Sequence, residues 1–419
     1  MYFLYNIFVL VFGFLLIPIS FFNKKIKLFL NGRKDTFQQL SVLKKTDRVV
    51  WFHCASLGEF EQGRPIIETF KIENPTFKIV LTFFSPSGYE IRQNYEFADV
   101  ICYLPLDTKK NVNRFLDLVH PEISIFVKYE FWPNILKELK NRNINTLLVS
   151  AIFRKSQVFF KSNSFAKNFM RNSLKAFNHF FVQDINSEKL LNTIGFNNVT
   201  VSGDTRFDSV SNISKQDYTL DFMEKFLKND TNFVLVAGST WHQDEEIIIN
   251  YINKYATTEQ QFIIAPHNIK PTEIKKLKNK INKKTILYSE FHLHKQEEQV
   301  LILDTIGLLS KIYKHATIAY IGGGFGNGIH NILEAATYGV PILIGPKYDK
   351  FKEAVELIDK KGCFVINNEK DFIDNILFLK NPKLLKNTSE ITLNYVNDNI
   401  GATKCILSYI KKNMTNFTT

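Results

Sequence analysis

Cysteine is scarce in this chain, with four residues in 419. The four are scattered, form no Cys-x-x-Cys pair and have no metal-ligand spacing with histidine, so we expect no structural zinc site. The same scarcity favours a reducing compartment. A long-range repeat is also lacking, which indicates two different halves in series. The four cysteines are Cys54, Cys102, Cys363 and Cys405.

Charge is absent from residues 1–22, which are mostly Phe, Leu, Ile and Val, and lysines follow from Lys24. A run of about 20 apolar residues is long enough to cross a bilayer. A signal peptide would carry its positive charge before the apolar segment, whereas here it comes after. The positive-inside rule then places the N-terminus outside and the body in the cytoplasm. Pro18 leaves a shallow anchor in one leaflet open, and either arrangement puts the body at a membrane face.

The length suits two domains of ordinary size plus an appendage. The net charge of +12 favours an anionic partner, which is a nucleic acid, an anionic membrane or a phosphorylated substrate. Charge alone does not choose among these three.

A glycine cluster stands between two predicted strands, Ile318–Ile321 and Val340–Ile344. We expect a helix to begin near His330, and a strand, glycine turn and helix in this order present free backbone N–H groups to a phosphate. Asn331 stands at the same mouth, and Glu334 can accept hydrogen bonds from sugar hydroxyls. The alternative is an ordinary glycine-rich connection, but the polar trio favours a ligand site.

Glu59 follows the predicted strand Asp47–Cys54 on a short loop before a helix. It is either a first-turn glutamate that complements the helix dipole or a general base, and composition does not separate the two. Glu130 follows the strand Ile123–Val127 at the same sheet edge. Because it precedes a helix that begins at a proline, we expect it to be exposed.

The second half opens with the strand Phe233–Ala237, after a polar stretch. This strand ends in a small-residue turn containing Ser239, a second position compatible with phosphate. His267 follows a further strand, Phe262–Ala265. Past Phe372 the sequence is typical of helices. Other strands are predicted at Lys78–Phe84, Thr146–Ser150, Phe180–Gln183, Val199–Ser202 and Val300–Leu303.

Five motifs together resemble the ordered signatures of the 3-deoxy-D-manno-octulosonic acid (Kdo) transferases of lipopolysaccharide assembly. The resemblance covers nearly the whole chain and includes the apolar N-terminus. The motifs are Phe52–Glu59, Glu130–Asn134, Gly203–Asp208, Ala237–His242 and Gly322–Glu334.

The resemblance implies an α/β protein of the GT-B class, with two Rossmann-like domains facing a cleft and an N-terminal membrane anchor helix. It implies transfer of Kdo from CMP-Kdo to the lipid A precursor with inversion, Glu59 as general base, and no cofactor, metal or nucleic acid. The absence of an Asp-x-Asp motif near the glycine loops agrees with that. The predicted segments are 1–22 (anchor), 35–208 (acceptor domain), 209–230 (linker), 231–395 (donor-nucleotide domain) and 396–419 (C-terminal helix and tail).

The same resemblance assigns site residues to the two domains. On the acceptor side these are Ser56, Gly58, Glu130 and Arg206. On the donor side they are Ser239, His242, His267, Gly323, Gly324, His330, Asn331 and Glu334.

The chain departs from the family pattern at two positions. His267 follows Pro266 where the family commonly has arginine, which removes a permanent cation from the donor site, and Leu308 stands where an acidic residue is common. His267, when protonated, or Lys347 can compensate for the missing cation.

Two other functions stay open. One is a membrane-associated GT-B enzyme that uses a UDP-sugar, and the other is a non-catalytic relative that binds glycolipid. Retention of Glu59 argues against the second, because a protein that only binds does not need a base. The sequence does not fix how many Kdo residues are added.

Overall fold

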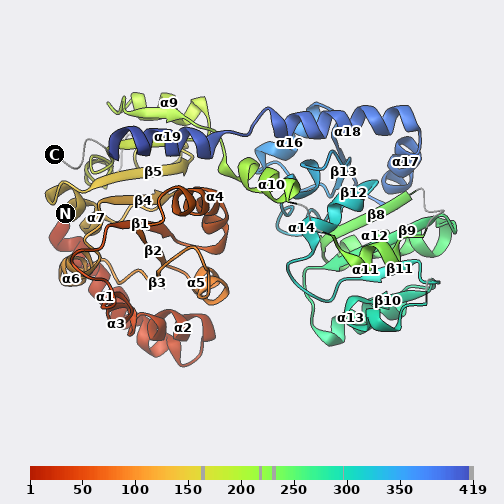
Figure 1. Cartoon of the computed structure of the whole chain (residues 1–419), viewed down its shortest axis with the longest axis horizontal. Coiled ribbons are helices and arrows are strands. Elements are labelled where there is room, and N and C mark those ends of the chain that lie inside the picture. Colours follow the sequence, from red (N-terminus) through yellow and green to blue (C-terminus); the bar gives the residue numbers. More distant parts are fainter. Residues whose placement is uncertain (162–165, 217–218, 229–232, 296, 415–419) are drawn as a thin grey trace. The chain divides into compact units, whose positions relative to one another are not determined.

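The computed structural model describes residues 1–161, 166–216, 219–228, 233–295 and 297–414. The chain divides into two compact units, one formed by residues 1–209 with those from Ile400 onward, the other by Val210–Asn399. Each unit contains a seven-stranded sheet whose paired strands are all parallel (Figure 1). The predicted α/β class with two Rossmann-like domains is confirmed.

The N-terminal sheet has the strand order β3-β2-β1-β4-β5-β6-β7. Its strands are near-continuous apolar runs, as parallel strands covered on both faces require. They are β1 (Val49–Cys54), β2 (Lys78–Phe83), β3 (Val100–Tyr103), β4 (Ile123–Val127), β5 (Asn145–Ala151), β6 (His179–Val182) and β7 (Val199–Val201).

Helices cover both faces of this sheet. On one face Trp51 packs edge-on against Phe115 of α6, and on the other Val50 shares a core with Phe60 of α4 and Ile406 of α19. The helices of this unit are α1 (Tyr2–Ser20), α2 (Lys24–Gly32), α3 (Thr36–Leu40), α4 (Leu57–Glu73), α5 (Pro86–Arg92), α6 (Lys109–Val119), α7 (Pro133–Asn141), α8 (Lys167–Leu174), α9 (Ile185–Asn192) and α19 (Ala402–Met414). Helix α10 (Thr205–Lys215) begins in this unit and ends in the other.

The C-terminal sheet has the order β10-β11-β9-β8-β12-β13-β14. Its strands are β8 (Phe233–Thr240), β9 (Gln260–Pro266), β10 (Thr285–Leu287), β11 (Val300–Ile302), β12 (Ile318–Ile321), β13 (Ile342–Ile344) and β14 (Cys363–Val365). Its α-helices are α11 (Asp221–Phe226), α12 (His242–Tyr255), α13 (Pro271–Lys280), α14 (Leu309–Ile312), α15 (Leu333–Ala336), α16 (Lys352–Asp359), α17 (Glu369–Leu379) and α18 (Pro382–Asn397), with short 3₁₀ turns at Tyr288–Leu293 and Tyr313–His315.

Three strands were not predicted, and all three are short edge strands. They are β3, β10 and β14, and each closes one side of its sheet. An edge strand of three or four residues pairs with one neighbour only and is too short for a periodic sequence signal.

The segment predicted as a linker, 209–230, contains the end of α10 and all of α11. The chain from Ile400 onward belongs with the N-terminal unit, where Asp208 accepts hydrogen bonds from the backbone N–H groups of Gly401 (2.6 Å) and Thr403 (2.7 Å). The Asp208 carboxylate therefore binds N–H groups at the start of α19. The tail beyond Met414 and part of the predicted linker lie outside the described residues.

Candidate active site

The N-terminal sheet reverses its strand order between β1 and β4, which pair directly. Ligands of open α/β sheets bind outside the carboxyl ends of the strands at such a switch point. Glu59 follows β1 and Glu130 follows β4, so the topology brings both carboxylates to this position.

Glu59 lies in the first turn of α4, with Ser56 as the extended residue before it. Its Oε2 accepts a hydrogen bond of 2.5 Å from the backbone N–H of Ala55. Burial, and then the negative charge of Glu130, raise the pKa of Glu59 to about 7. The same side chain thus fixes the strand end before its own helix and is poised to take a proton near neutral pH.

Glu130 is buried, with 9% of its surface exposed, so the prediction that it is exposed is wrong. Its Oε2 accepts hydrogen bonds from Trp132 Nε1 (2.7 Å) and His53 Nε2 (3.1 Å). His53 is fully buried, and its other ring nitrogen lies 2.8 Å from Thr82 Oγ1. These partners compensate the cost of burying the carboxylate, and they turn it away from solvent.

Gly58 is the exposed member of the predicted acceptor-side group. A Cβ placed on it would meet nothing closer than Ser56 Oγ, at 4.0 Å, and its backbone is not left-handed. Packing within the chain therefore does not require glycine here, and the space beside it stays open.

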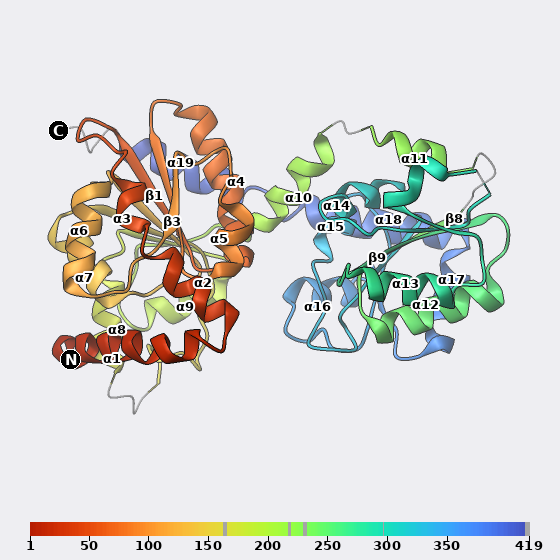
Figure 2. The same cartoon turned by 90° about the horizontal axis from the view of Figure 1, so that it is seen from below.

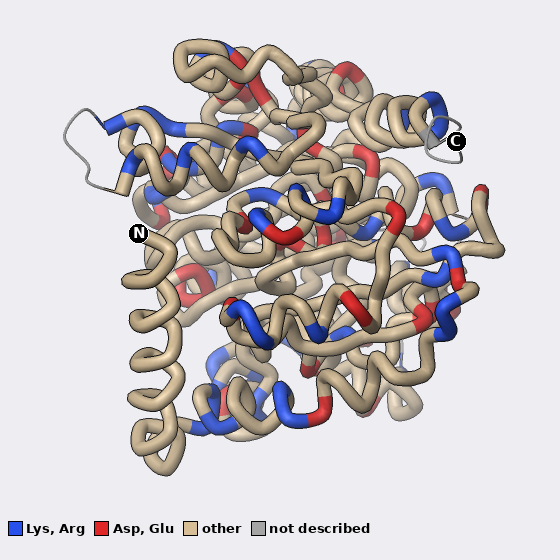
Figure 3. The backbone as a smooth tube through the Cα atoms, turned by 90° about the vertical axis from the view of Figure 1, so that its left-hand side faces the viewer, with Lys and Arg blue, Asp and Glu red and all other residues tan. Residues whose placement is uncertain are grey.

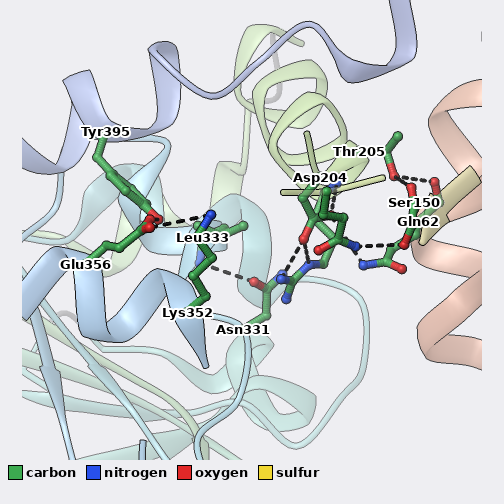
Figure 4. Close-up of polar contacts among 11 residues, drawn as sticks. Gln62, Ser150, Asp204, Thr205, Asn331, Leu333, Lys352, Glu356 and Tyr395 are labelled. Carbon is green, nitrogen blue, oxygen red and sulfur yellow. Dashed lines mark hydrogen bonds and ion pairs between the residues drawn. The ribbon is translucent and has the colours of Figure 1, made fainter. Parts of the chain in front are cut away.

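Arg206 is bound to Asp204, with Nη2 2.7 Å and Nε 2.8 Å from Asp204 Oδ2. Asp204 also accepts from Gln62 Nε2 (3.3 Å), and the Thr205 hydroxyl donates to the Gln62 carbonyl (2.6 Å; Figure 4). Gln62 lies one turn after Glu59 on α4. The Gly203–Asp208 motif thus holds the helix that carries the candidate base.

The C-terminal sheet has its switch point between β8 and β12, which also pair directly. A pocket of about 530 Å³ lies there. It takes in four of the predicted donor-side residues, whereas Ser239, Gly324, Asn331 and Glu334 do not line it. The lining residues are Trp241, His242, Gln243, Asp244, His267, Gly323, Phe325, Gly326, Asn327, Gly328 and His330.

Three aromatic rings contact one another in this pocket. Trp241 and His267 are stacked, with ring centroids 4.4 Å apart, and the tilted ring of His330 lies 4.7 Å from that of His267. Trp241 Nε1 donates to His330 Nε2 at 3.3 Å, which requires that nitrogen to be unprotonated. Burial, followed by the nearby His267, lowers the pKa of His330. This aromatic cluster therefore offers flat aromatic surface and a neutral imidazole.

Asp244, in the first turn of α12, fixes the geometry of this pocket. The buried carboxylate accepts from the backbone N–H of Trp241 (2.8 Å), from that of Gly323 (2.9 Å) and from the Tyr320 hydroxyl (2.7 Å). It thereby joins α12 to the glycine loop. Asp244 was not predicted as a site residue, although an acidic residue at the third position of a helix after a strand end is a recognisable signal.

Neighbouring backbone atoms leave no space for a side chain at several glycines of the loop after β12. A Cβ on Gly322 would lie 2.4 Å from the Ser239 carbonyl oxygen, and one on Gly324 would lie 2.6 Å from Gly345. Gly323 has φ +94°, a left-handed conformation that favours glycine. Gly324 is thus a packing residue, and Gly323 lines the pocket while meeting a conformational demand.

The helix expected near His330 begins later, at Leu333, and α15 has only four residues. Asn331 fills the turn before it, where its Oδ1 accepts from the Leu333 N–H (3.2 Å; Figure 4) and its Nδ2 donates to Glu334 Oε1 (3.2 Å). The prediction that a helix with free N–H groups begins near His330 is therefore wrong. Asn331 and Glu334 are joined to each other at this turn.

Two donor-side residues lie at the edges of the arrangement. Ser239 has a left-handed backbone (φ +53°) at the end of β8. His242 is exposed and lies 3.4 Å from Glu246 on the next turn of α12. Across the described ranges, no group of three or more His, Cys, Asp or Glu side chains is arranged to hold a metal ion.

Residues 31–209, which include the whole switch point around Glu59, match the family described as 3-Deoxy-D-manno-octulosonic-acid transferase (kdotransferase). Sequence similarity extends into the second unit. A 3-deoxy-D-manno-octulosonic acid transferase of Aquifex aeolicus is 28% identical over 347 residues, covering 81% of this chain and 88% of that protein. The N-terminal domain thus matches the Kdo transferase family, and similarity to curated Kdo transferases extends over most of the chain.

A bifunctional glycosyltransferase/methyltransferase of Fusobacterium nucleatum is 26% identical over 380 residues, or 87% of this chain. The match spans 57% of the length of that relative. Among solved structures, UDP-GlcNAc 2-epimerase from Neisseria meningitidis has a TM-score of 0.62 at 16% identity, covering 87% of this chain and all of that one, a likeness of fold alone. The similarity to Kdo transferases supports a glycosyltransferase, and the two parallel sheets have a GT-B-like fold.

Proposed function

We propose that the protein transfers Kdo from CMP-Kdo to the lipid A precursor in lipopolysaccharide synthesis, by a metal-independent reaction that inverts the anomeric carbon. The observation that carries the proposal is Glu59, a partly buried carboxylate with a raised pKa at the switch point of the family-matching domain. A general base works best when its pKa lies near the working pH.

In the proposed reaction the Glu59 carboxylate takes the proton of an acceptor hydroxyl as that oxygen forms a bond to the anomeric carbon of Kdo. The bond from this carbon to the phosphate oxygen breaks, and CMP leaves with the electron pair. Gly58 leaves space for the acceptor beside the base. Glu130 keeps the pKa of Glu59 high without contacting the substrate.

We assign donor binding to the C-terminal pocket. The cluster of Trp241, His267 and His330 suits a flat ligand group, and the glycines that line the pocket let a phosphate approach the backbone closely. His267 is the residue that we propose in place of the family's arginine. Ser239, His242, Asn331 and Glu334 complete the donor side, and Arg206 and Ser56 the acceptor side.

We place the body of the protein on the cytoplasmic side of the inner membrane, with α1 as a single N-terminal anchor. Among the described helices, α1 is long and apolar enough to cross a membrane. The lysines that follow it in α2 support a cytoplasmic body. Proteolysis of inside-out and right-side-out vesicles tests the side: cleavage of the body in right-side-out vesicles contradicts this placement.

Purified protein incubated with CMP-Kdo and tetraacylated lipid A precursor should yield products heavier by one or more Kdo residues, read by mass spectrometry in the presence of EDTA. Glu59→Gln should reduce turnover about a hundredfold to ten-thousandfold while retaining CMP binding. Near-normal turnover of that variant overturns the assignment of the base.

Competition for the donor site tests its nucleotide. CMP should protect the C-terminal pocket and inhibit transfer at concentrations where UDP does not. Stronger inhibition by UDP would indicate a transferase that uses a UDP-sugar. Binding of glycolipid without transfer from either donor would indicate a non-catalytic binding protein.

A further inference from the structure

Helix α1 is fastened to the N-terminal domain near its first residues. The Tyr5 hydroxyl donates to Asp107 (2.7 Å), and Asn134 Nδ2 donates to Asn6 Oδ1 (3.0 Å). Asp107 is buried and also accepts from the first N–H groups of α7, that of Asn134 among them (3.0 Å). These polar bonds hold the start of α1 against the body.

The second half of α1 contacts the same domain. A Cβ on Gly13 would lie 3.1 Å from Leu106, in the connection between β3 and α6, and Leu16 is buried. A helix held near both ends by one body runs along its surface, as Figure 2 shows. This geometry favours the shallow anchor over the spanning one, because the first residues of a spanning helix would leave the cytoplasmic body.

The outward side of α1 is apolar and exposed. Phe3 is 75% exposed and Phe8 is 64% exposed, and Phe22 beyond the helix is 94% exposed. Figure 3 shows that the helix starting at the N-terminus has no charged residue along its length. An exposed apolar face of this extent on an uncharged helix indicates contact with hydrocarbon.

A groove of about 530 Å³ lies between α1, α2 and the connection from β3 to α6. Leu10, Phe14 and Ile17 of α1 form one wall, and Leu30 and Leu106 belong to the other. Leu10 is 51% exposed and Phe14 is 70% exposed, so the groove is continuous with the apolar face of α1. From Asn6 to Ile17 it is about 17 Å long, given the rise of a helix.

Two lysines stand at the rim of this groove. Lys109 and Lys110 begin α6, both line the groove, and both are exposed. Neither has an ion-pair partner in the part of the chain that the structure describes. An elongated apolar groove with unpaired cations at its rim matches an acyl chain attached to an anionic head group.

We propose that this groove binds one acyl chain of an anionic phospholipid of the bilayer, with the phosphate of the lipid held by Lys109 and Lys110. The lipid then completes the contact between α1 and the domain, and α1 lies in the plane of one leaflet. The proposal rests on the membrane location of α1 and is independent of the transfer reaction.

The test uses the full chain in vesicles that contain phosphatidylglycerol with a photoreactive acyl chain. Irradiation and peptide mass spectrometry should locate the label on 10–17 and 106–111. Leu10→Trp, which fills the groove, should reduce this labelling several-fold, whereas Leu15→Trp, on the exposed face outside the groove, should not. Phosphatidylcholine carrying the same photoreactive chain should label the groove less than phosphatidylglycerol does. Each lysine should contribute about fivefold to this preference, so the double variant K109Q/K110Q should label equally with the two lipids.

Labelling spread evenly over α1, or unchanged in Leu10→Trp, overturns the proposal. Loss of labelling when an equimolar amount of tetraacylated lipid A precursor is added before irradiation also overturns the proposal, because the groove then binds the acceptor. Circular dichroism of each variant establishes that it is folded. Labelling is measured on Glu59→Gln as well, so that failure of the transfer reaction is distinguishable from failure of the groove.

Discussion

His53 Nε2 and Glu130 Oε2 lie 3.1 Å apart behind the candidate base, and both side chains are buried. The same Oε2 also accepts from Trp132, so a single oxygen of Glu130 takes both hydrogen bonds. Glutamine at this position keeps an oxygen for both donors and removes only the charge.

Glu130→Gln should therefore lower the pKa of Glu59, because the Glu130 charge is one of the causes that raise it. The rising limb of the pH profile of kcat/KM, expected near pH 7, should move to lower pH. Glu61→Gln is the matched control. Glu61 lies on α4 with Glu59, but its carboxylate pairs with Arg64 and Arg92. An unmoved profile in Glu130→Gln would mean that Glu130 acts only through packing.

Replacing Glu59 should change the pH dependence of stability. Its pKa is raised from 4.5 to about 7, so the folded state holds a proton that the unfolded state releases. This group therefore lowers the free energy of unfolding as pH rises from about 4.5 through 7. Glu59→Gln should be more stable than the parent at pH 8, by on the order of 2 kcal/mol, with a smaller difference at pH 4.5.

Urea unfolding at both pH values measures this difference. Glu73→Gln, at the other end of α4, is the control and should show no such change. A Glu59→Gln gain that is the same at both pH values contradicts the raised pKa.

Asp244→Ala should disorder the donor pocket. It leaves the N–H groups of Trp241 and Gly323 and the Tyr320 hydroxyl without their acceptor, at about 1–3 kcal/mol for each buried group. We expect weaker CMP binding, measured by calorimetry, together with lower thermal stability. Lys254→Ala, exposed at the other end of the same helix, should leave both unchanged, and equal effects of the two variants would argue against a specific role for Asp244.

Asp208→Ala should release α19 from the N-terminal unit. The carboxylate accepts from Gly401 and Thr403 at the start of that helix, and loss of a helix cap costs about 0.5–2 kcal/mol. Hydrogen exchange should increase across residues 402–414, and Asp208→Asn should restore part of the protection. Unchanged exchange in Asp208→Ala would show that apolar packing of Ile406 alone holds the helix.

The positions of the central strands along the sequence were predictable, because β1, β4, β8 and β12 are apolar runs followed by glycine, serine or other polar residues. That ordering places Glu59 and His330 at carboxyl edges of the sheets. Three of the four edge strands, β3, β10 and β14, and the length of α15 were not predicted, since pairing with neighbours and not local pattern decides them; the fourth, β7, was predicted.

The sequence by itself determined the two α/β halves and the apolar N-terminus, because these depend on periodicity along the chain. The resemblance to Kdo transferases added Glu59 as the candidate base, which stays a prediction. The tertiary structure decided that Glu130 is buried, that Asp244 ties α12 to the glycine loop, and that α1 lies against the N-terminal domain. Each of these depends on contacts between residues far apart in sequence, for which the free energy of a buried polar group or an apolar face is set by its partner.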